Sequence, residues 1–204
     1  MQDISIKTNP VPSKLYAYQR FYEHLEKFEK DNINFSVTEF GCGGSKILKF
    51  FNPFFYQGID LNEEKILDSK KKYSDKNYNF YKGDMLNFES KQKTNYGLCF
   101  QTFGINISFN NENLLICLNN LNNHIHQNGS IVFNMSSELY MNNKDFIDEF
   151  CKKNYSSVNY IFYGIFNKRF NNLLTKILVR IEHLLSYKKF SQKYIYIKCE
   201  KKYD

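Results

Sequence analysis

Short apolar runs alternate with longer stretches of helical spacing through most of the chain. Five runs predict strands, at residues 34–40, 54–60, 78–82, 96–101 and 130–135. Apolar residues three and four positions apart predict helices over 62–74 and 110–127, and a shorter helix is expected over 46–51. Asn62 suits the start of the first of these helices, and Asn128-Gly129 suits the end of the second. Strands that alternate with helices predict a parallel sheet.

The two ends of the chain carry patterns of their own. Residues 14–31 have helical apolar spacing, which predicts an N-terminal helix. After residue 136 the pattern predicts a helix, a strand, a long helix and a last strand, at 144–153, 156–164, 169–187 and 193–200. Neither an internal repeat nor a linker interrupts the sequence, so we expect one domain over residues 1–204.

Composition is typical of a globular protein. Aromatic side chains make up 18% of the 204 residues, which argues against disorder. The five cysteines are scattered and form no C-x-x-C pair, so we expect neither a disulfide framework nor a metal site. A cytoplasmic location fits these cysteines best, since the N-terminus has no secretory signal and no apolar run reaches the ~18 residues of a membrane span.

The net charge of +7 is concentrated in one segment. Residues 1–167 contain 18 basic and 18 acidic residues and are therefore neutral. Residues 168–193 contain seven basic residues and one acidic residue, Glu182, which gives this segment six of the seven net charges. A protein that binds nucleic acid over its whole surface is not implied by so local a charge, so we disfavour a nucleic-acid partner.

A glycine turn directly follows the first predicted strand. Residues 36–45 read Ser-Val-Thr-Glu-Phe-Gly-Cys-Gly-Gly-Ser, in which Glu39 ends the strand. The next two strands end at Asp60 and at Gly83-Asp84. Glycine lets a backbone turn sharply and lets a ligand approach it closely, and parallel sheets bind ligands at the carboxyl ends of their strands. Three carboxylates and a glycine turn are therefore expected at one ligand-binding edge.

This order of parts resembles the class I S-adenosylmethionine (SAM)-dependent methyltransferases. Their first motif is an acidic residue followed by Gly-x-Gly-x-Gly, which stands here as Glu39, Gly41 and Gly43, with Ser45 in place of the third glycine. The resemblance covers roughly residues 34–136. It implies a Rossmann-like α/β fold with a seven-stranded, mostly parallel sheet, helices on both faces and a C-terminal antiparallel hairpin. It also divides the domain into an N-terminal helical lid (1–33), a cofactor-binding core (34–136) and C-terminal helices with the last two strands (137–204).

The resemblance implies SAM as the cofactor and gives roles to the residues of the core. Glu39 would bond the methionine moiety or orient the glycine turn formed by Gly41 and Gly43. Asp60 would accept both ribose hydroxyls, as the acidic residue of dinucleotide folds does at the same place. The alternative for Asp60 is a helix cap, although Asn62 can already serve as one.

The remaining cofactor contacts are expected beside these residues. Leu61 would pack on the adenine face, though it could equally belong to the core. The Asp84 side chain would meet the adenine amino group and the Met85 N–H a ring nitrogen, the alternative being an ordinary surface turn. Gln101 begins the segment that would face the sulfonium and the acceptor.

A dedicated catalytic base is optional for this reaction. Methyl transfer from a sulfonium is an SN2 step that positioning and desolvation can largely promote, while a hydroxyl acceptor would gain from a base. Glu138 and Tyr140 follow the fifth strand on the productive edge and are the candidates. The segment after the fourth strand begins Gln101-Thr102-Phe103-Gly104 and lacks the Asn/Asp-Pro-Pro-Tyr pattern of enzymes that methylate base amines, which disfavours a nucleobase acceptor.

We therefore expect a SAM-dependent methyltransferase that acts on a hydroxyl or amine of a small molecule or sugar, as in surface-glycan biosynthesis. The alternatives are an RNA methyltransferase that uses the basic segment 168–193, and a non-catalytic SAM-binding module. A nucleotide-dependent oxidoreductase is disfavoured by Gly83-Asp84-Met85. The apolar stripe of residues 169–187 either packs on the fold or contacts an anionic membrane, and the sequence leaves the oligomeric state open.

Overall fold

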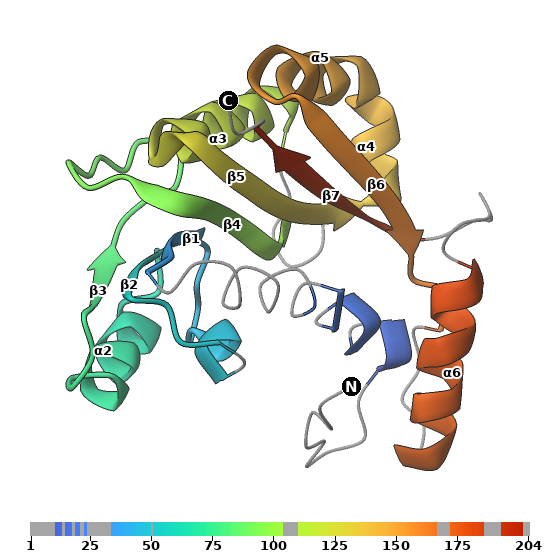
Figure 1. Ribbon diagram of the computed structural model, residues 1–204, viewed down its shortest axis with the longest axis horizontal. Coiled ribbons are helices and arrows are strands. Elements are labelled where there is room, and N and C mark those ends of the chain that lie inside the picture. Colours follow the sequence, from blue (N-terminus) through green and yellow to red (C-terminus); the bar gives the residue numbers. More distant parts are fainter. Residues whose placement is uncertain are drawn as a thin grey trace.

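A seven-stranded sheet lies at the centre of the molecule, with the strand order β3-β2-β1-β4-β5-β7-β6 (Figure 1). The computed structural model describes residues 11–13, 15–17, 19–20, 23, 34–49, 51–103, 110–166, 172–185 and 193–201. The strands are β1 (Ser36–Phe40), β2 (Phe55–Asp60), β3 (Tyr78–Lys82), β4 (Thr94–Phe103), β5 (Ile125–Ser136), β6 (Ser157–Tyr163) and β7 (Tyr194–Glu200). No helix within these ranges is long and apolar enough to cross a membrane.

Pairing within the sheet is parallel from β3 through β5, and β7 runs antiparallel between β5 and β6. The predicted fold class, a mostly parallel seven-stranded sheet whose last two strands form an antiparallel pair, is confirmed. Ser136 at the end of β5 and Tyr163 at the end of β6 both pair with Tyr194. The segment that follows β6 therefore leaves the sheet at the same edge as the ends of the parallel strands.

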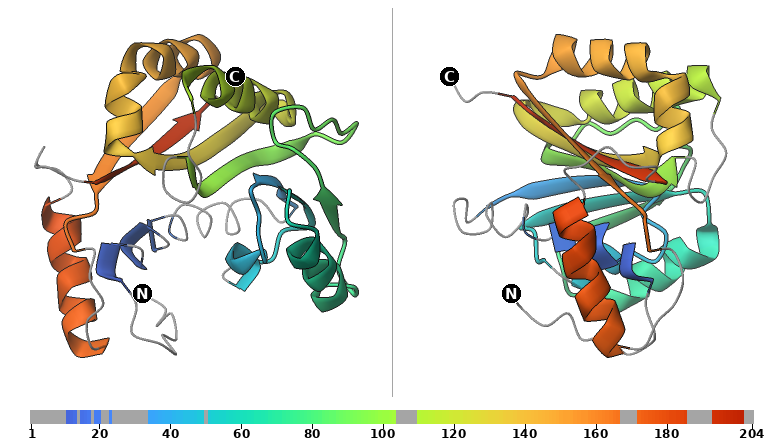
Figure 2. Two further views of the ribbon diagram at one scale, coloured as in Figure 1. Left: turned by 180° about the vertical axis from the view of Figure 1, so that it is seen from behind. Right: turned by 90° about the vertical axis from the view of Figure 1, so that its right-hand side faces the viewer.

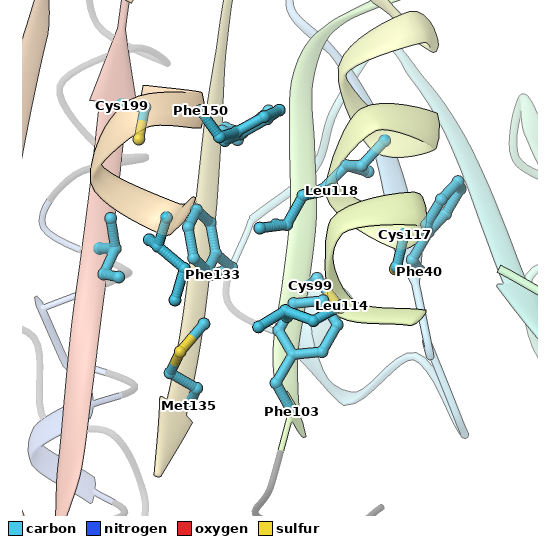
Figure 3. Packing of buried hydrophobic residues seen from close by; sticks show 14 of the residues in the cluster. Phe40, Cys99, Phe103, Leu114, Cys117, Leu118, Phe133, Met135, Phe150 and Cys199 are labelled. Carbon is cyan, nitrogen blue, oxygen red and sulfur yellow. The ribbon is translucent and has the colours of Figure 1, made fainter. Parts of the chain in front are cut away.

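Helices cover both faces of this sheet (Figures 1 and 2). They are the 3₁₀ turn η1 (Lys46–Lys49) and the α-helices α2 (Glu63–Lys72), α3 (Asn111–Asn123), α4 (Ser137–Asn142), α5 (Lys144–Asn154) and α6 (Asn172–Leu185). One face packs against α3 and α5, in a cluster that includes Phe40, Leu114, Leu118, Phe133 and Phe150 (Figure 3). The other face packs against the N-terminal segment, η1 and α2.

Four elements differ most from the prediction, and one of them is β5, which begins at Ile125 rather than at residue 130. Helix α3 ends at Asn123 rather than near residue 127, because Ile125 already pairs with Thr94 and the sheet takes up the following residues, including Asn128-Gly129. The predicted helix over 46–51 is only a four-residue 3₁₀ turn. Helix α4 was not predicted; Ser136 caps it by accepting the Leu139 N–H at 3.2 Å. The described residues between 12 and 23 are helical, and the rest of the predicted helix 14–31 lies outside the described residues.

Candidate functional site

The glycine turn leaves β1 through three residues with left-handed backbone. Gly41, Gly43 and Ser45 have φ angles of 70°, 51° and 49°. The Gly41 and Cys42 N–H groups both donate to the carbonyl of Ile59 in β2, at 2.8 and 3.1 Å. A φ in this range favours glycine, and Ser45 adopts it although it carries a Cβ. The turn is therefore held in a fixed shape against the end of β2.

Asp60 fastens the glycine turn to the start of α2. Its Oδ2 accepts the Gly43 N–H at 2.7 Å, and its Oδ1 accepts the Asn62 N–H at 2.8 Å. A carboxylate offers about four acceptor positions, so about two remain for other donors. The cap of α2 is Asn62, whose Oδ1 accepts the Lys65 N–H at 3.0 Å. Leu61, beside this carboxylate, is 59% exposed and so does not belong to the core.

Glu39 is buried beneath the turn. The Tyr56 hydroxyl donates to its Oε2, and burial together with the nearby Asp60 charge raises the pKa of Glu39 to about 8, against the opposing effect of this hydrogen bond. Glu39 is paired with Gly58 across the β1–β2 register. A Cβ on Gly58 would lie 2.8 Å from the Tyr56 ring and 2.9 Å from Cys42 Sγ. The bare backbone at Gly58 therefore makes room for the tyrosine that holds Glu39.

Asp84 lies in the turn after β3, next to the end of β2. The Gly83 N–H donates to the Asp60 carbonyl at 3.1 Å, and Asp84 Oδ1 accepts the Leu86 N–H at 2.9 Å. Met85 is buried, and its carbonyl accepts the Asn120 side-chain amide at 2.9 Å. The ends of β1, β2 and β3 thus bring Glu39, Asp60 and Asp84 to one edge of the sheet, as expected from their positions in the sequence.

The candidates for the acceptor side lie on other elements of the same edge. Gln101 lies in β4, and its side chain is outside the described part of the structure. Glu138 is exposed in the first turn of α4. Tyr140 is buried, and its hydroxyl donates to Asp148 Oδ1 at 3.1 Å. Burial and the Asp148 charge raise the pKa of Tyr140, which makes its hydroxyl a weaker acid than that of an exposed tyrosine. The catalytic roles of Glu138 and Tyr140 stay predictions.

Sequence reasoning missed Tyr56 and Gly58, although both are central to the site. Their spacing of two residues on one strand places them on the same face. That alternation was visible, but nothing in it indicated that the tyrosine would fold over a neighbouring glycine to reach the next strand. Among the described side chains, no group of three or more His, Cys, Asp or Glu residues could hold a metal ion.

A comparison with protein-family models gives no match, and neither does one with curated protein sequences. Solved structures do resemble this chain. Magnesium protoporphyrin IX methyltransferase from Synechocystis, with bound SAM, has a TM-score of 0.60 at 12% identity, over 96% of this chain and 86% of that chain. The plantazolicin methyltransferase BpumL, in complex with S-adenosylhomocysteine (SAH), has a TM-score of 0.58 at 17% identity, over 94% and 86%.

A third similar structure is the N-methyltransferase NodS from Bradyrhizobium japonicum, with a TM-score of 0.56 at 9% identity, over 91% of this chain and 97% of that chain. Together with the strand order, these likenesses show that the chain has the class I SAM-dependent methyltransferase fold. They cover nearly the whole of the chain, whereas the motifs that carry the sequence resemblance lie within roughly residues 34–136.

Proposed function

We propose that the protein transfers the methyl group of SAM to a hydroxyl or amine of a small molecule or sugar. The observation that carries this proposal is the carboxylate of Asp60, which is bonded to the backbone of the glycine turn and keeps acceptor positions unused. A ribose presents two adjacent hydroxyl donors, and a carboxylate can accept both. The position of Asp60 at the carboxyl ends of the parallel strands and its unused acceptor positions therefore both support a ligand that contains a ribose.

The residues around Asp60 fit the rest of SAM. A Cβ on Gly44 would meet no atom within 4 Å, so the backbone of the turn is open to a ligand there. The exposed Leu61 offers an apolar surface for an adenine ring. Glu39 provides a carboxyl group for the ammonium of the methionine moiety, and a bound cation would favour its ionised form. The neighbouring structures with bound SAM or SAH make this cofactor the one to test first.

When bound, SAM supplies a methyl group activated by its sulfonium. The chain's own contribution is to hold the cofactor and to exclude water from the transfer, which lowers the barrier through positioning. If the acceptor is a hydroxyl, Glu138 is the better placed of the two candidate bases, because it is exposed whereas the Tyr140 hydroxyl is bonded to Asp148. The five cysteines are buried free thiols, which suits a reducing cytoplasm.

A small acceptor is favoured over RNA by the distribution of charge. The sequence over residues 1–167, which contains the glycine turn and all three strand-end carboxylates, has no net charge. An RNA substrate needs a basic surface, often with aromatic platforms for its bases. The fold itself does not decide the matter, since an rRNA methylase from Streptococcus thermophilus has a TM-score of 0.51 at 10% identity, over 83% of this chain and 88% of that chain. Sugars, including those of surface glycans, belong to the proposed acceptor class.

Methyl transfer can be followed with SAM that carries an isotopically labelled methyl group. The protein is incubated with labelled SAM and either a small-molecule extract or purified RNA, and the products are analysed by mass spectrometry. We expect the label in small molecules and an equal amount of SAH. Label found in RNA alone would contradict the proposed acceptor class, and formation of no SAH with any acceptor would favour a non-catalytic SAM-binding module.

A further inference from the structure

Helix α6 exposes a stripe of apolar side chains, here called the outer stripe. Leu173 is 73% exposed and Leu184 is 69% exposed, although both are leucines of an otherwise well-packed α/β fold. The outer stripe consists of Leu173, Leu174, Ile177, Ile181 and Leu184. At 100° per residue these five positions fall within an arc of about 100°. The sequence predicted one continuous apolar stripe along this helix. The structure divides that stripe into an exposed part and a buried part, since Leu178 is buried.

The opposite side of α6 is the one that packs on the protein. Thr175, Leu178, Val179 and Glu182 are buried there. Glu182 is the only acidic residue of the helix, and its carboxylate accepts the N–H groups of Gly164 and Ile165 at 2.5 and 3.0 Å. The acidic side chain of the helix therefore faces inward, where backbone N–H groups donate hydrogen bonds to it.

Among the described residues of α6, the charged side chains on the outward side are both basic. Lys176 and Arg180 are exposed and lie on the arc that borders the outer stripe. In the sequence, Lys168 and Arg169 precede the helix and Lys188 and Lys189 follow it. An exposed apolar stripe bordered by cations is the arrangement of helices that lie in the interface of an anionic membrane.

From this arrangement we propose that α6 docks on the surface of an anionic phospholipid bilayer. The leucines and isoleucines of the outer stripe enter the boundary between headgroups and acyl chains, and Lys176 and Arg180 contact the anionic headgroups. The 14 residues of the helix span about 21 Å, so the stripe can lie along the membrane plane over its whole length. The views of Figures 1 and 2 agree that α6 lies at the periphery, beside the N-terminal segment.

A second copy of the chain is a poorer occupant for this surface. A helix about 21 Å long and about 10 Å wide presents about 200 Å², whereas a stable interface buries about 800 Å² of each partner. Two copies joined through α6 would also bring the basic residues of both helices close together. A bilayer has neither difficulty, because its area is unlimited and its charge is opposite.

Docking through α6 would also place the ligand-binding edge near the membrane. Helix α6 follows β6 in the chain, and the end of β6 at Tyr163 lies at the same edge of the sheet as the end of β5 at Ser136. The proposal itself does not depend on methyl transfer, and its test needs neither SAM nor an acceptor.

Sedimentation with vesicles tests the proposal. The protein is mixed with vesicles of phosphatidylcholine alone, or of phosphatidylcholine with phosphatidylglycerol, and pelleted at low and at high salt. We expect binding to the anionic vesicles only, weakened by salt. Lys176→Gln with Arg180→Gln should lower the partition coefficient about thirtyfold. The matched pair Lys71→Gln with Lys72→Gln, on exposed positions of α2, should leave it unchanged.

A second set of variants tests the contribution of the exposed leucines to vesicle binding. Leu173→Asn with Leu184→Asn should lower the partition coefficient by about a hundredfold. The melting temperature should fall by no more than about 4 °C, because both side chains are largely exposed and only helix propensity is lost. Leu67→Asn, on an exposed position of α2, is the control. The proposal would be overturned if the wild type sedimented with no vesicle, if it sedimented equally with neutral vesicles, or if it formed a dimer that the leucine variant dissociates. RNA binding lost in the lysine–arginine variant, without vesicle binding in the wild type, would also overturn it.

Discussion

The carboxylate of Glu182 in α6 accepts a hydrogen bond of 3.0 Å from the hydroxyl of Ser13, a residue 169 positions earlier in the chain. The same carboxylate accepts the Phe166 N–H at 3.2 Å, and Ser13 Oγ also accepts that N–H at 3.1 Å. One buried carboxylate thus joins the N-terminal segment, the turn after β6 and helix α6. Tyr16 adds to this junction, since its ring lies 6.1 Å from that of Tyr163.

Replacing Glu182 by Gln should therefore destabilise the protein. Both oxygens of the carboxylate accept N–H or O–H donors, so the amide NH₂ of glutamine must face at least one buried donor. We expect the free energy of unfolding to fall by about 3 kcal/mol, because a hydrogen bond to a charged group is worth about 1.5–3 kcal/mol. Urea denaturation measures the loss, with Glu149→Gln on an exposed position of α5 as the control. Equal stability of the two variants would contradict the account of this junction.

Gly58→Ala and Gly44→Ala should have opposite outcomes. A Cβ at Gly58 would lie 2.8 Å from the Tyr56 ring and 2.9 Å from Cys42 Sγ, both buried, whereas a Cβ at Gly44 would meet nothing within 4 Å. We expect Gly58→Ala to lower the free energy of unfolding by about 1–3 kcal/mol through overpacking. Gly44→Ala should change it by less than about 0.5 kcal/mol. Thermal unfolding of the two variants distinguishes them, and a harmless Gly58→Ala would mean that Tyr56 can move away from Glu39 freely.

The buried Glu39 should make stability depend on pH. Its pKa is about 8 in the folded protein and about 4.5 in the unfolded chain. Below a pH of about 4.5, Glu39 is protonated in both the folded and the unfolded state, so it does not make the free energy of unfolding depend on pH. Between the two pKa values only the folded state keeps the proton, so the free energy of unfolding falls as the pH rises towards 8. Over this pH range the free energy of unfolding of the wild type should fall by a few kcal/mol relative to that of Glu39→Gln, at about 1.4 kcal/mol per pKa unit.

Denaturation of wild type and Glu39→Gln at a series of pH values measures this dependence. Glu89→Gln, at an exposed position, should follow the wild type throughout. If the free energies of unfolding of wild type and Glu39→Gln differed by the same amount from pH 5 to 9, Glu39 would be ionised over the whole range. Its burial would then not raise its pKa.

Asp60→Ala should weaken SAM binding by about 2–4 kcal/mol, because two hydrogen bonds to a charged acceptor are lost. The fold should persist, since the Gly43 and Asn62 N–H groups that Asp60 accepts are not fully buried and water can replace it. Titration calorimetry gives the affinity, and circular dichroism checks the fold. Asp75→Ala, at an exposed position, is the control. An unchanged dissociation constant would mean that Asp60 only fastens the glycine turn to α2.

The sheet and the edge that carries the three carboxylates were predictable because their signals are local. Glu39, Asp60 and Asp84 lie at or directly after the ends of the first three strands. Parallel strands bring such ends together at one edge, whatever the packing around them. Helix α2 was placed within two residues because Asn62 is both a polar cap in the sequence and the observed cap. Helix α4 was missed because its six residues are too few for a helical period to appear.

The features that the sequence did not reveal depend on contacts between distant residues. Helix α3 ends earlier than predicted because Ile125 pairs with Thr94 in the sheet. The residues Asn128-Gly129, which predicted a turn after the helix, therefore belong to β5. The division of the α6 stripe into buried and exposed sides depends on where Glu182 is held, and that is decided by Ser13 and the turn after β6. An apolar stripe alone cannot tell which of its edges faces the protein.

The central claim is that the edge formed by Glu39, Asp60 and Asp84 binds SAM. Titration calorimetry of the purified protein with SAM, SAH and NAD tests it most directly. We predict that SAM and SAH bind with one site per chain and that NAD gives no heat of binding. Tight binding of NAD, with none of SAM or SAH, would contradict the account and indicate a dinucleotide-dependent protein instead.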